Sequence, residues 1–290
     1  MEKIITNDRG AIYHLDIRPK ELGDTVILVG DQGRVTQVSQ YFDQINFRGN
    51  NREFHWATGA LGDKSVTVLS TGIGADNIDI VMNELEALAN MNFETHCFQK
   101  ERKVLDLVRI GTCGTIQLPV SVGTYCVSQY AIGLDNTIKF YEGSEVVLEH
   151  PLSQHINAHL DYTGALDHPY SSAGDATLID QWFPDEPFIK GITVSAPGFY
   201  GPQGRSRIMR PRFPDLYQRL GTFSFRDKQI LNFEMEAAPI YAFAKLLGHR
   251  AVTVCLVLAN RITDDFLPDY KPKMDTLIRQ VLDRIKNTKV

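Results

Sequence analysis

The sequence lacks the residue patterns of several common protein classes. Its 290 residues include only 4 cysteines, and none forms a C-x-x-C pair or has zinc-site spacing to a histidine. No apolar run approaches the roughly 20 residues that a membrane helix needs, and residues 1–5 have no apolar segment typical of a signal peptide. We therefore expect a protein of the reducing cytoplasm, without a disulfide framework, a metal centre or a membrane span.

An excess of basic residues is also missing. Lys and Arg number 30 against 35 Asp and Glu, which gives a formal net charge of -5 at pH 7. Nucleic-acid wrapping depends on a broad basic surface, so we do not expect a nucleic-acid partner. A local cluster of arginines could still bind a small anion.

Apolar runs that suit buried strands alternate with amphipathic helical patterns. The runs occupy residues 25–29, 65–69, 104–110, 123–127, 191–195 and 251–258. Apolar residues recur at helical spacing over 78–88 and 274–285, and more weakly over 153–160. Continuous apolar strands are typical of a sheet covered on both faces. The sequence predicts a single α/β domain over residues 1–290, with a central mixed β-sheet flanked by helices. The polar stretch 91–103 is either a helix extension or a surface insertion.

Two glycine loops follow predicted strands. Gly30-Asp31-Gln32-Gly33-Arg34 comes after the run at 25–29, and the loop 70–77 comes after the run at 65–69. Glycine at a strand end lets backbone N–H groups approach an anion, and Arg34 could add a charge-assisted contact. Each loop alone is also compatible with a tight turn between a strand and a helix.

Arg109 comes at the end of the apolar run 104–110, and a loop of small residues with Thr112 follows it. The planar guanidinium of arginine can bind two phosphate oxygens at once, and Thr112 could donate to the same anion. A buried arginine needs a partner for its charge. A core carboxylate is the structural alternative, but we favour a bound anion.

Two further motifs could contact a sugar and a heterocycle. Glu234 and Glu236, in N-F-E-M-E, should point in different directions, so we do not expect an acid–base pair. One of them could accept hydrogen bonds from vicinal hydroxyls, although composition alone favours two acids at a helix N-terminus. Gln203 and Arg205, on a turn behind Phe199, could bind the carbonyls and N–H of uracil. The alternative for this turn is an exposed polar loop.

In this order, the motifs resemble the nucleoside phosphorylase family, and within it the uridine phosphorylase branch. The motifs are G-D-x-x-R, R-x-G-[TS]-x-G, F-Y-x-x-Q-x-R and N-F-E-M-E, and the resemblance runs from about Tyr13 to the C-terminal helix. It implies reversible phosphorolysis of uridine to uracil and ribose 1-phosphate, in pyrimidine salvage or catabolism. Inorganic phosphate is then the co-substrate and no cofactor is needed. The resemblance also implies a dimer as the functional unit and leaves a hexamer open.

The resemblance assigns roles to individual residues. Those for phosphate are Gly30, Arg34, Arg109 and Thr112, with Arg52 supplied by a neighbouring subunit. Those for ribose are Thr112, Met235 and Glu236, with His14 supplied by a neighbouring subunit. Those for the base are Phe199, Gln203, Arg205, Leu258, Ala259 and Arg261. The catalytic set within these residues is Arg109, Gln203, Arg205 and Glu236.

Two departures from the family pattern bear on substrate and ions. Purine-cleaving relatives have an aspartate after the last strand, where this sequence has Asn260, and this favours a pyrimidine. Some members bind potassium between subunits, and Glu53, Ile73 and Asn77 match that site. Asn77 replaces a serine there, but an amide oxygen can also ligate a hard cation. The alternatives are a purine or methylthioadenosine phosphorylase, a nucleosidase that uses water, and a non-catalytic nucleoside-binding protein.

Overall fold

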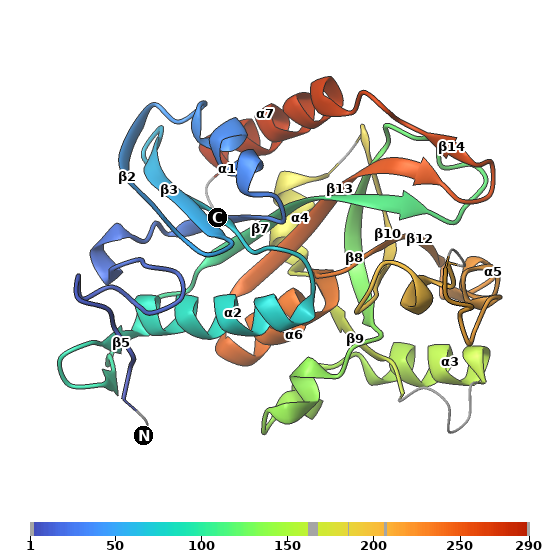
Figure 1. Cartoon of the computed structure of the whole chain (residues 1–290), viewed down its shortest axis with the longest axis horizontal. Helices are drawn as coiled ribbons and strands as arrows, with labels where there is room; N and C mark the ends of the chain where they lie inside the picture. The colour runs from blue at the N-terminus through green and yellow to red at the C-terminus, as the bar shows by residue number, and fades with distance from the viewer. Residues whose placement is uncertain (1–2, 162–167, 185, 206–207, 289–290) are drawn as a thin grey trace.

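The computed structural model describes residues 3–161, 168–184, 186–205 and 208–288. Helices cover both faces of a mixed β-sheet (Figure 1). The strands are β1 (Thr25–Val29), β2 (Gln44–Asn51), β3 (Phe54–Leu61), β4 (Lys64–Ser70), β5 (Met91–Asn92), β6 (Cys97–Phe98), β7 (Asp106–Thr115), β8 (Tyr125–Gly133), β9 (Tyr170–Ala173), β10 (Phe188–Ser195), β11 (Ser224–Phe225), β12 (Lys228–Glu234), β13 (Arg250–Asn260) and β14 (Asp265–Phe266). The α-helices are α1 (Gln32–Ser39), α2 (Ala75–Asn90), α3 (His150–Leu160), α4 (Ala176–Trp182), α5 (Leu216–Gly221), α6 (Ala237–Leu247) and α7 (Lys271–Asn287). Short 3-10 helices occupy Pro19–Glu21, Thr137–Phe140, Ser144–Val147 and Gly201–Gln203.

The main sheet closes on itself at one end. Its strand order is β11-β12-β10-β8-β13-β7-β1-β4-β3-β2, and β12 also pairs with β7. The strands β12, β10, β8, β13 and β7 therefore form a ring in the described part of the chain. The pairs β1–β4, β1–β7 and β7–β13 are parallel, whereas β8–β13 and β7–β12 are antiparallel. The predicted mixed α/β fold is confirmed.

The apolar strands separate two cores. In β1, Val26 and Leu28 pack in the core that contains α2 and α6, whereas Ile27 and Val29 pack in the core that contains α1, α4 and α7. Figure 1 shows these two groups of helices on opposite faces of the sheet. Fully burying one such side chain contributes about 1.5–3 kcal/mol. Because both faces are covered, the strand is apolar throughout instead of alternating.

Several predicted elements are confirmed, and some boundaries differ. The helical patterns at 78–88 and 274–285 lie in α2 and α7, and the weak pattern at 153–160 lies in α3. Strand β7 extends to Thr115, so Arg109 lies in the middle of a strand and not at its end. The stretch 91–103 contains the short antiparallel pair β5–β6, which is the surface-insertion alternative and not a helix extension.

No helix in the described residues is long and apolar enough to cross a membrane.

Candidate active site

The parallel strands β1 and β4 end together at one corner of the sheet, beside the second half of β7. Gly30 follows β1, Gly72 and Gly74 follow β4, and Thr112 lies half-buried in the second half of β7. A Cβ on Gly30 would lie 3.4 Å from the carbonyl oxygen of Gly72, so the two loops are in contact. Gly72 and Gly74 have φ values of +72° and +106°, which L side chains rarely adopt. Helices α1 and α2 both begin at this corner, and helix N-termini favour anions.

Arg34 extends from α1 to β7. Arg34 is only 6% exposed, and its Nη1 donates to the carbonyl oxygen of Ile110 at 3.3 Å. Its buried Nε has no hydrogen-bond partner among the described residues. Burial lowers the pKa of Arg34, the Asp31 charge opposes this shift, and the Arg109 charge adds to it. Because an unsatisfied buried donor costs about 1–3 kcal/mol, an anionic acceptor beside Arg34 would be stabilised.

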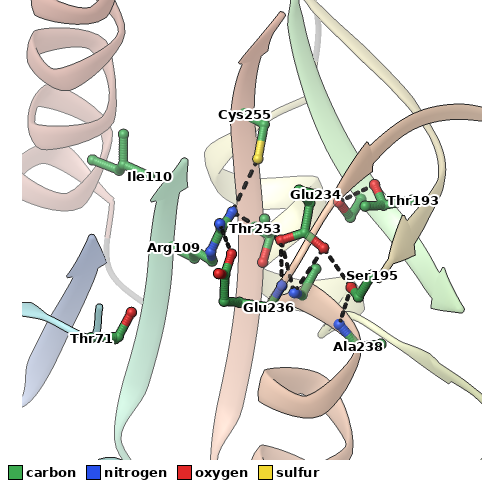
Figure 2. Close-up of polar contacts among 12 residues, drawn as sticks. Thr71, Arg109, Ile110, Thr193, Ser195, Glu234, Glu236, Ala238, Thr253 and Cys255 are labelled. Atoms are coloured by element: carbon green, nitrogen blue, oxygen red, sulfur yellow. Dashed lines mark hydrogen bonds and ion pairs between the residues drawn. The ribbon is translucent and has the colours of Figure 1, made fainter. Parts of the chain in front are cut away.

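Arg109 contacts two carboxylates in the interior (Figure 2). Its Nη1 lies 3.1 Å from Oε2 of Glu234, and its Nη2 forms a close ion pair with Glu236. Burial disfavours the charge of Arg109, but Glu236 and Glu234 outweigh this effect and hold its pKa above its usual value. In the free protein the charge of Arg109 is therefore paired with core carboxylates, which is the structural alternative to a bound anion. Any anion at this position would share Arg109 with these carboxylates or displace one of them.

Glu234 and Glu236 converge on Arg109, so the prediction that they point in different directions is wrong. Glu234 is the last residue of β12, and the chain turns before α6 begins. The Glu234 carboxylate accepts hydrogen bonds from the backbone N–H groups of Glu236 at 2.9 Å and Ala237 at 2.9 Å, and from the Ser195 hydroxyl. The expectation of an acid at the N-terminus of α6 is confirmed for Glu234. The sequence did not assign Glu234 to the site. The signal in the sequence that could have indicated it is its position directly before a helix.

The side chain of Glu236 contacts both Arg109 of β7 and the backbone at the start of α2. Its Oε1 accepts from the Gly74 N–H at 2.8 Å, while its Oε2 faces Arg109. Burial raises the pKa of Glu236, Arg109 opposes this shift, and Glu234 adds to it. A carboxylate beside a buried guanidinium group can accept hydrogen bonds from hydroxyls, while the cation binds an oxyanion.

A second group of residues lies beyond the ends of β10 and β13. Gln203 is 3% exposed, and its Oε1 accepts from Arg205 Nε at 3.4 Å. The Arg205 guanidinium carbon lies 4.2 Å from the centre of the Phe199 ring. Arg261 donates from Nη1 to the carbonyl oxygen of Gln203 at 2.7 Å. The structure therefore brings together Phe199, Gln203, Arg205 and Arg261. Burial of Gln203 argues against the alternative of an exposed polar loop.

Tyr217, on α5, supports this group and was not selected from the sequence. The Arg261 guanidinium carbon lies 4.1 Å from the centre of its ring, a cation–π distance. Burial and the Arg205 charge lower the pKa of Arg261 to about 10. Nothing in the local pattern around Tyr217 distinguishes it from a packing residue. Leu258 and Ala259 are half-buried at the end of β13, just before Arg261.

His14 and Arg52 lie in two segments that contact each other. Asn51 Nδ2 donates to the carbonyl oxygens of Tyr13 at 3.1 Å and of His14 at 2.9 Å. The Nδ1 atom of His14 lies 2.6 Å from Glu84 Oε1, and Arg52 is an exposed turn residue with a φ of +54°. Within the described residues, no hydrogen bond or ion pair joins either side chain to the Arg109 or the Gln203 group.

Glu53, Ile73 and Asn77 gather around Gly72. A Cβ on Gly72 would lie 2.5 Å from Asn77 Nδ2 and 3.4 Å from Glu53 Cγ. The neighbouring Ile73 is 69% exposed. The structure thus places these three residues together, on a loop that begins close to Gly30.

The Asn260 side chain, at the end of β13, forms hydrogen bonds with the backbone of the surrounding loops. Its Nδ2 donates to the carbonyl oxygens of Gln117 at 3.1 Å and Val120 at 2.9 Å, and its Oδ1 accepts from the Ile262 N–H at 2.8 Å. The side chain therefore stabilises the local backbone. The acids that follow Asn260 in the sequence, Asp264 and Asp265, are both exposed.

The chain is similar to known proteins over most of its length. Residues 24–284 match the phosphorylase superfamily. A uridine phosphorylase of Thermococcus kodakarensis is 31% identical over 271 residues, which cover 92% of this chain and 85% of that protein. A guanosine phosphorylase of Halorubrum lacusprofundi is 26% identical over 94% of this chain and 97% of its own length. A solved nucleoside phosphorylase of Trypanosoma brucei, described as showing uridine phosphorylase activity, superimposes with a TM-score of 0.87 at 27% identity. The superposition covers 99% of this chain and 100% of that one.

Proposed function

This chain belongs to the phosphorylase superfamily, and from that premise we propose that it is a uridine phosphorylase, a pentosyltransferase that reversibly cleaves uridine with inorganic phosphate. The products are uracil and ribose 1-phosphate. The observation that carries the proposal is the pair of buried arginines, Arg34 and Arg109, of which Arg109 contacts the buried carboxylate of Glu236. The similarity to uridine phosphorylases over most of the chain supports the choice of nucleoside.

Phosphate binds at the corner where β1 and β4 end beside the second half of β7. The backbone at Gly30, the hydroxyl of Thr112 and the guanidinium groups of Arg34 and Arg109 hold its oxygens. Two observations support this role: the unsatisfied Nε of Arg34, and the start of α1 at the same corner. Holding the nucleophile beneath the sugar removes the entropic cost of bringing it there.

Ribose binds next to this phosphate, between Glu236 and Met235. Glu236 accepts hydrogen bonds from the 2′ and 3′ hydroxyls, and in doing so it exchanges its contact with Arg109 for the diol. Arg109 becomes available to phosphate in the same step. Phosphate then attacks C1′ through a transition state that resembles an oxocarbenium ion.

Uracil binds between Phe199 and the half-buried end of β13 at Leu258 and Ala259. Gln203 and Arg205 bind its polar edge. As the glycosidic bond breaks, negative charge develops on the base, and the charges of Arg205 and Arg261 stabilise it. This interaction is stronger in the transition state than in the ground state, so it accelerates the chemical step.

A second copy of the chain completes the site. We propose that its His14 contacts the 5′ hydroxyl and its Arg52 contacts phosphate, because neither side chain contacts the Arg109 group of its own chain in the described residues. A dimer is the minimum functional unit, and a hexamer is an assembly of such dimers. Potassium between the copies, at Glu53, Ile73 and Asn77, stays a prediction, as do the single-domain organisation of residues 1–290 and the cytoplasmic location.

Two rival activities use different groups. Purine phosphorolysis benefits from an acid near the base, but Asn260 is an amide whose polar atoms bind the loop backbone. A nucleosidase needs no anion site, and this conflicts with two buried arginines. The guanosine phosphorylase relative makes purine nucleosides a necessary part of any substrate panel.

The direct test is release of uracil from uridine by the purified protein, with and without inorganic phosphate. We expect release only with phosphate. Release without phosphate would identify a nucleosidase, and cleavage of inosine, guanosine or methylthioadenosine in preference to uridine would identify a purine enzyme. Binding of uridine without any turnover would support a nucleoside-binding protein.

A further inference from the structure

Three buried thiols lie together beside the Arg109 group. Cys255 on β13 is the register partner of Gly111 on β7 and of Cys126 on β8. Cys113 follows Gly111 by two residues, so its side chain lies on the same face of β7. All three cysteines are free, and their exposures are 7% for Cys113, 0% for Cys126 and 1% for Cys255. They belong to a small apolar cluster with Val120 and Val257.

One of these thiols contacts the guanidinium directly. Arg109 Nη1 donates to the Sγ of Cys255 at 3.1 Å (Figure 2). A Cβ on Gly111 would lie 2.1 Å from Arg109 Nη1 and 2.9 Å from Cys255 Sγ. The guanidinium and the sulfur therefore meet over Gly111, where β7 has no side chain. Cys126 is also paired with Cys255, but within the described residues no hydrogen bond joins it to Arg109.

Cys255 lies beside Cys113 and Cys126 in the same apolar cluster. A hydrogen bond with Cys113 lowers the pKa of Cys255, burial opposes this shift, and the charge of Arg109 adds to the lowering. Burial raises the pKa of Cys113 well above its usual value, and contacts with Cys126 and Cys255 add to the rise. The contact that bears on Arg109 is the one with the Cys255 sulfur.

This contact matters most when substrates are bound. In the free protein Arg109 is held by Glu234, Glu236 and Cys255. In the proposed mechanism Glu236 turns to the ribose hydroxyls, and only Glu234 and Cys255 then hold Nη1. With a single holding group the guanidinium could rotate away from the phosphate position, whereas two acceptors on the same nitrogen fix its plane.

We propose that Cys255 is a positioning residue for the phosphate co-substrate: its sulfur holds Arg109 Nη1 so that the remaining donors of the guanidinium face phosphate. The inference rests on the proposed function, because it assumes that Arg109 binds phosphate. It assigns a role in phosphate affinity to a residue that does not touch the substrate.

The test compares Cys255→Ala with Cys126→Ala. Both changes remove one buried sulfur from the same cluster, but only the first removes a contact with Arg109. Phosphate binding is measured by titration calorimetry, and KM and kcat by uracil release with phosphate or uridine varied. We expect Cys255→Ala to weaken phosphate binding roughly five- to tenfold, as for loss of one typical hydrogen bond, with much less change in the KM for uridine. Cys126→Ala should leave the phosphate affinity near the wild-type value.

A third variant separates the hydrogen bond from packing. A hydroxyl oxygen also accepts from a guanidinium, so Cys255→Ser should recover most of the phosphate affinity that Cys255→Ala loses. The proposal is overturned if Cys255→Ala and Cys126→Ala weaken phosphate binding equally. It is also overturned if Cys255→Ser binds phosphate no more tightly than Cys255→Ala. If the wild-type protein binds phosphate but releases no uracil, the proposed function fails, and the binding series still decides the role of Cys255. If the wild-type protein binds no phosphate, both proposals fail.

Discussion

Gly111 offers a sharp test of how the guanidinium of Arg109 is oriented. In Gly111→Ala, the new Cβ would lie 2.1 Å from Arg109 Nη1 and 2.7 Å from its Cζ. Ordinary contacts begin at 3.4 Å, so the guanidinium must retreat by about 1.3 Å or the strand must shift. Either movement lengthens the 3.1 Å contacts of Nη1 with Glu234 and Cys255.

The expected effect is large on turnover and moderate on stability. A displacement of about 1 Å in a positioned group can lower the rate about 100-fold, and overpacking a core costs about 1–3 kcal/mol. We therefore expect phosphate-dependent uracil release to fall about 100-fold, with a rise in the KM for phosphate. The melting temperature should fall by a few degrees, so the variant should still be folded when assayed.

Gly114→Ala is the matched control on the same strand. Its Cβ would lie 3.7 Å from the carbonyl oxygen of Ala259 and 3.9 Å from Arg205 Nη2, both ordinary contact distances. We expect turnover and phosphate KM close to those of the wild-type protein. A folded Gly111→Ala variant with wild-type phosphate KM and kcat would refute the argument that the position of Arg109 controls phosphate use.

Three further predictions address the proposed phosphate and base groups. Arg109→Ala should reduce phosphate-dependent turnover by about 10²–10³, the usual effect of losing an oriented electrostatic donor; unchanged turnover would remove Arg109 from the phosphate site. Gln203→Ala should relax or remove the use of uridine, because a buried polar group that binds a base rejects mismatched partners strongly, and full uridine activity in kcat/KM measurements would place Gln203 outside the base site. Arg261, whose pKa is lowered to about 10 by burial and the Arg205 charge, is charged below that pH and loses its proton above it. Turnover should therefore fall as pH rises through about 10, and in Arg261→Gln this part of the decline should be missing; an identical alkaline profile in the two proteins would contradict the role of Arg261.

The sequence predicts the elements whose patterns are strong and local. The repeat of apolar residues in α7 and the continuous apolar run of β1 each admit one interpretation, and the structure confirms them. The extension of β7 to Thr115 was missed, because glycines and threonines after Ile110 indicate a loop. Those residues are held in a strand by pairing with β13 along the whole segment, which a local pattern does not contain.

The sequence predicted that the motif residues assigned to the base lie together, but it did not predict the contacts within the candidate site. The motif residues of the base group, Gln203, Arg205 and Arg261, do lie together. Glu234 and Tyr217 were missed because their roles depend on partners far along the chain, Arg109 for the first and Arg261 for the second. The convergence of Glu234 and Glu236 was also missed, since side-chain alternation within one element says nothing about a turn between a strand and a helix.

The groups assigned to phosphate and ribose come from other segments of the chain than the groups assigned to the base. The groups assigned to phosphate and ribose lie on β7, on the turn from β12 into α6 and on the loops after β1 and β4, all on or beside strands of the main sheet. The groups assigned to the base come from the segment after β10 and from the end of β13 with the residue Arg261 that follows it. Amino-acid replacements, insertions and loop exchanges in these segments can therefore change the accepted base over evolutionary time while the phosphate and sugar contacts stay intact. A guanosine phosphorylase and uridine phosphorylases that align with nearly the whole chain are what such divergence would produce.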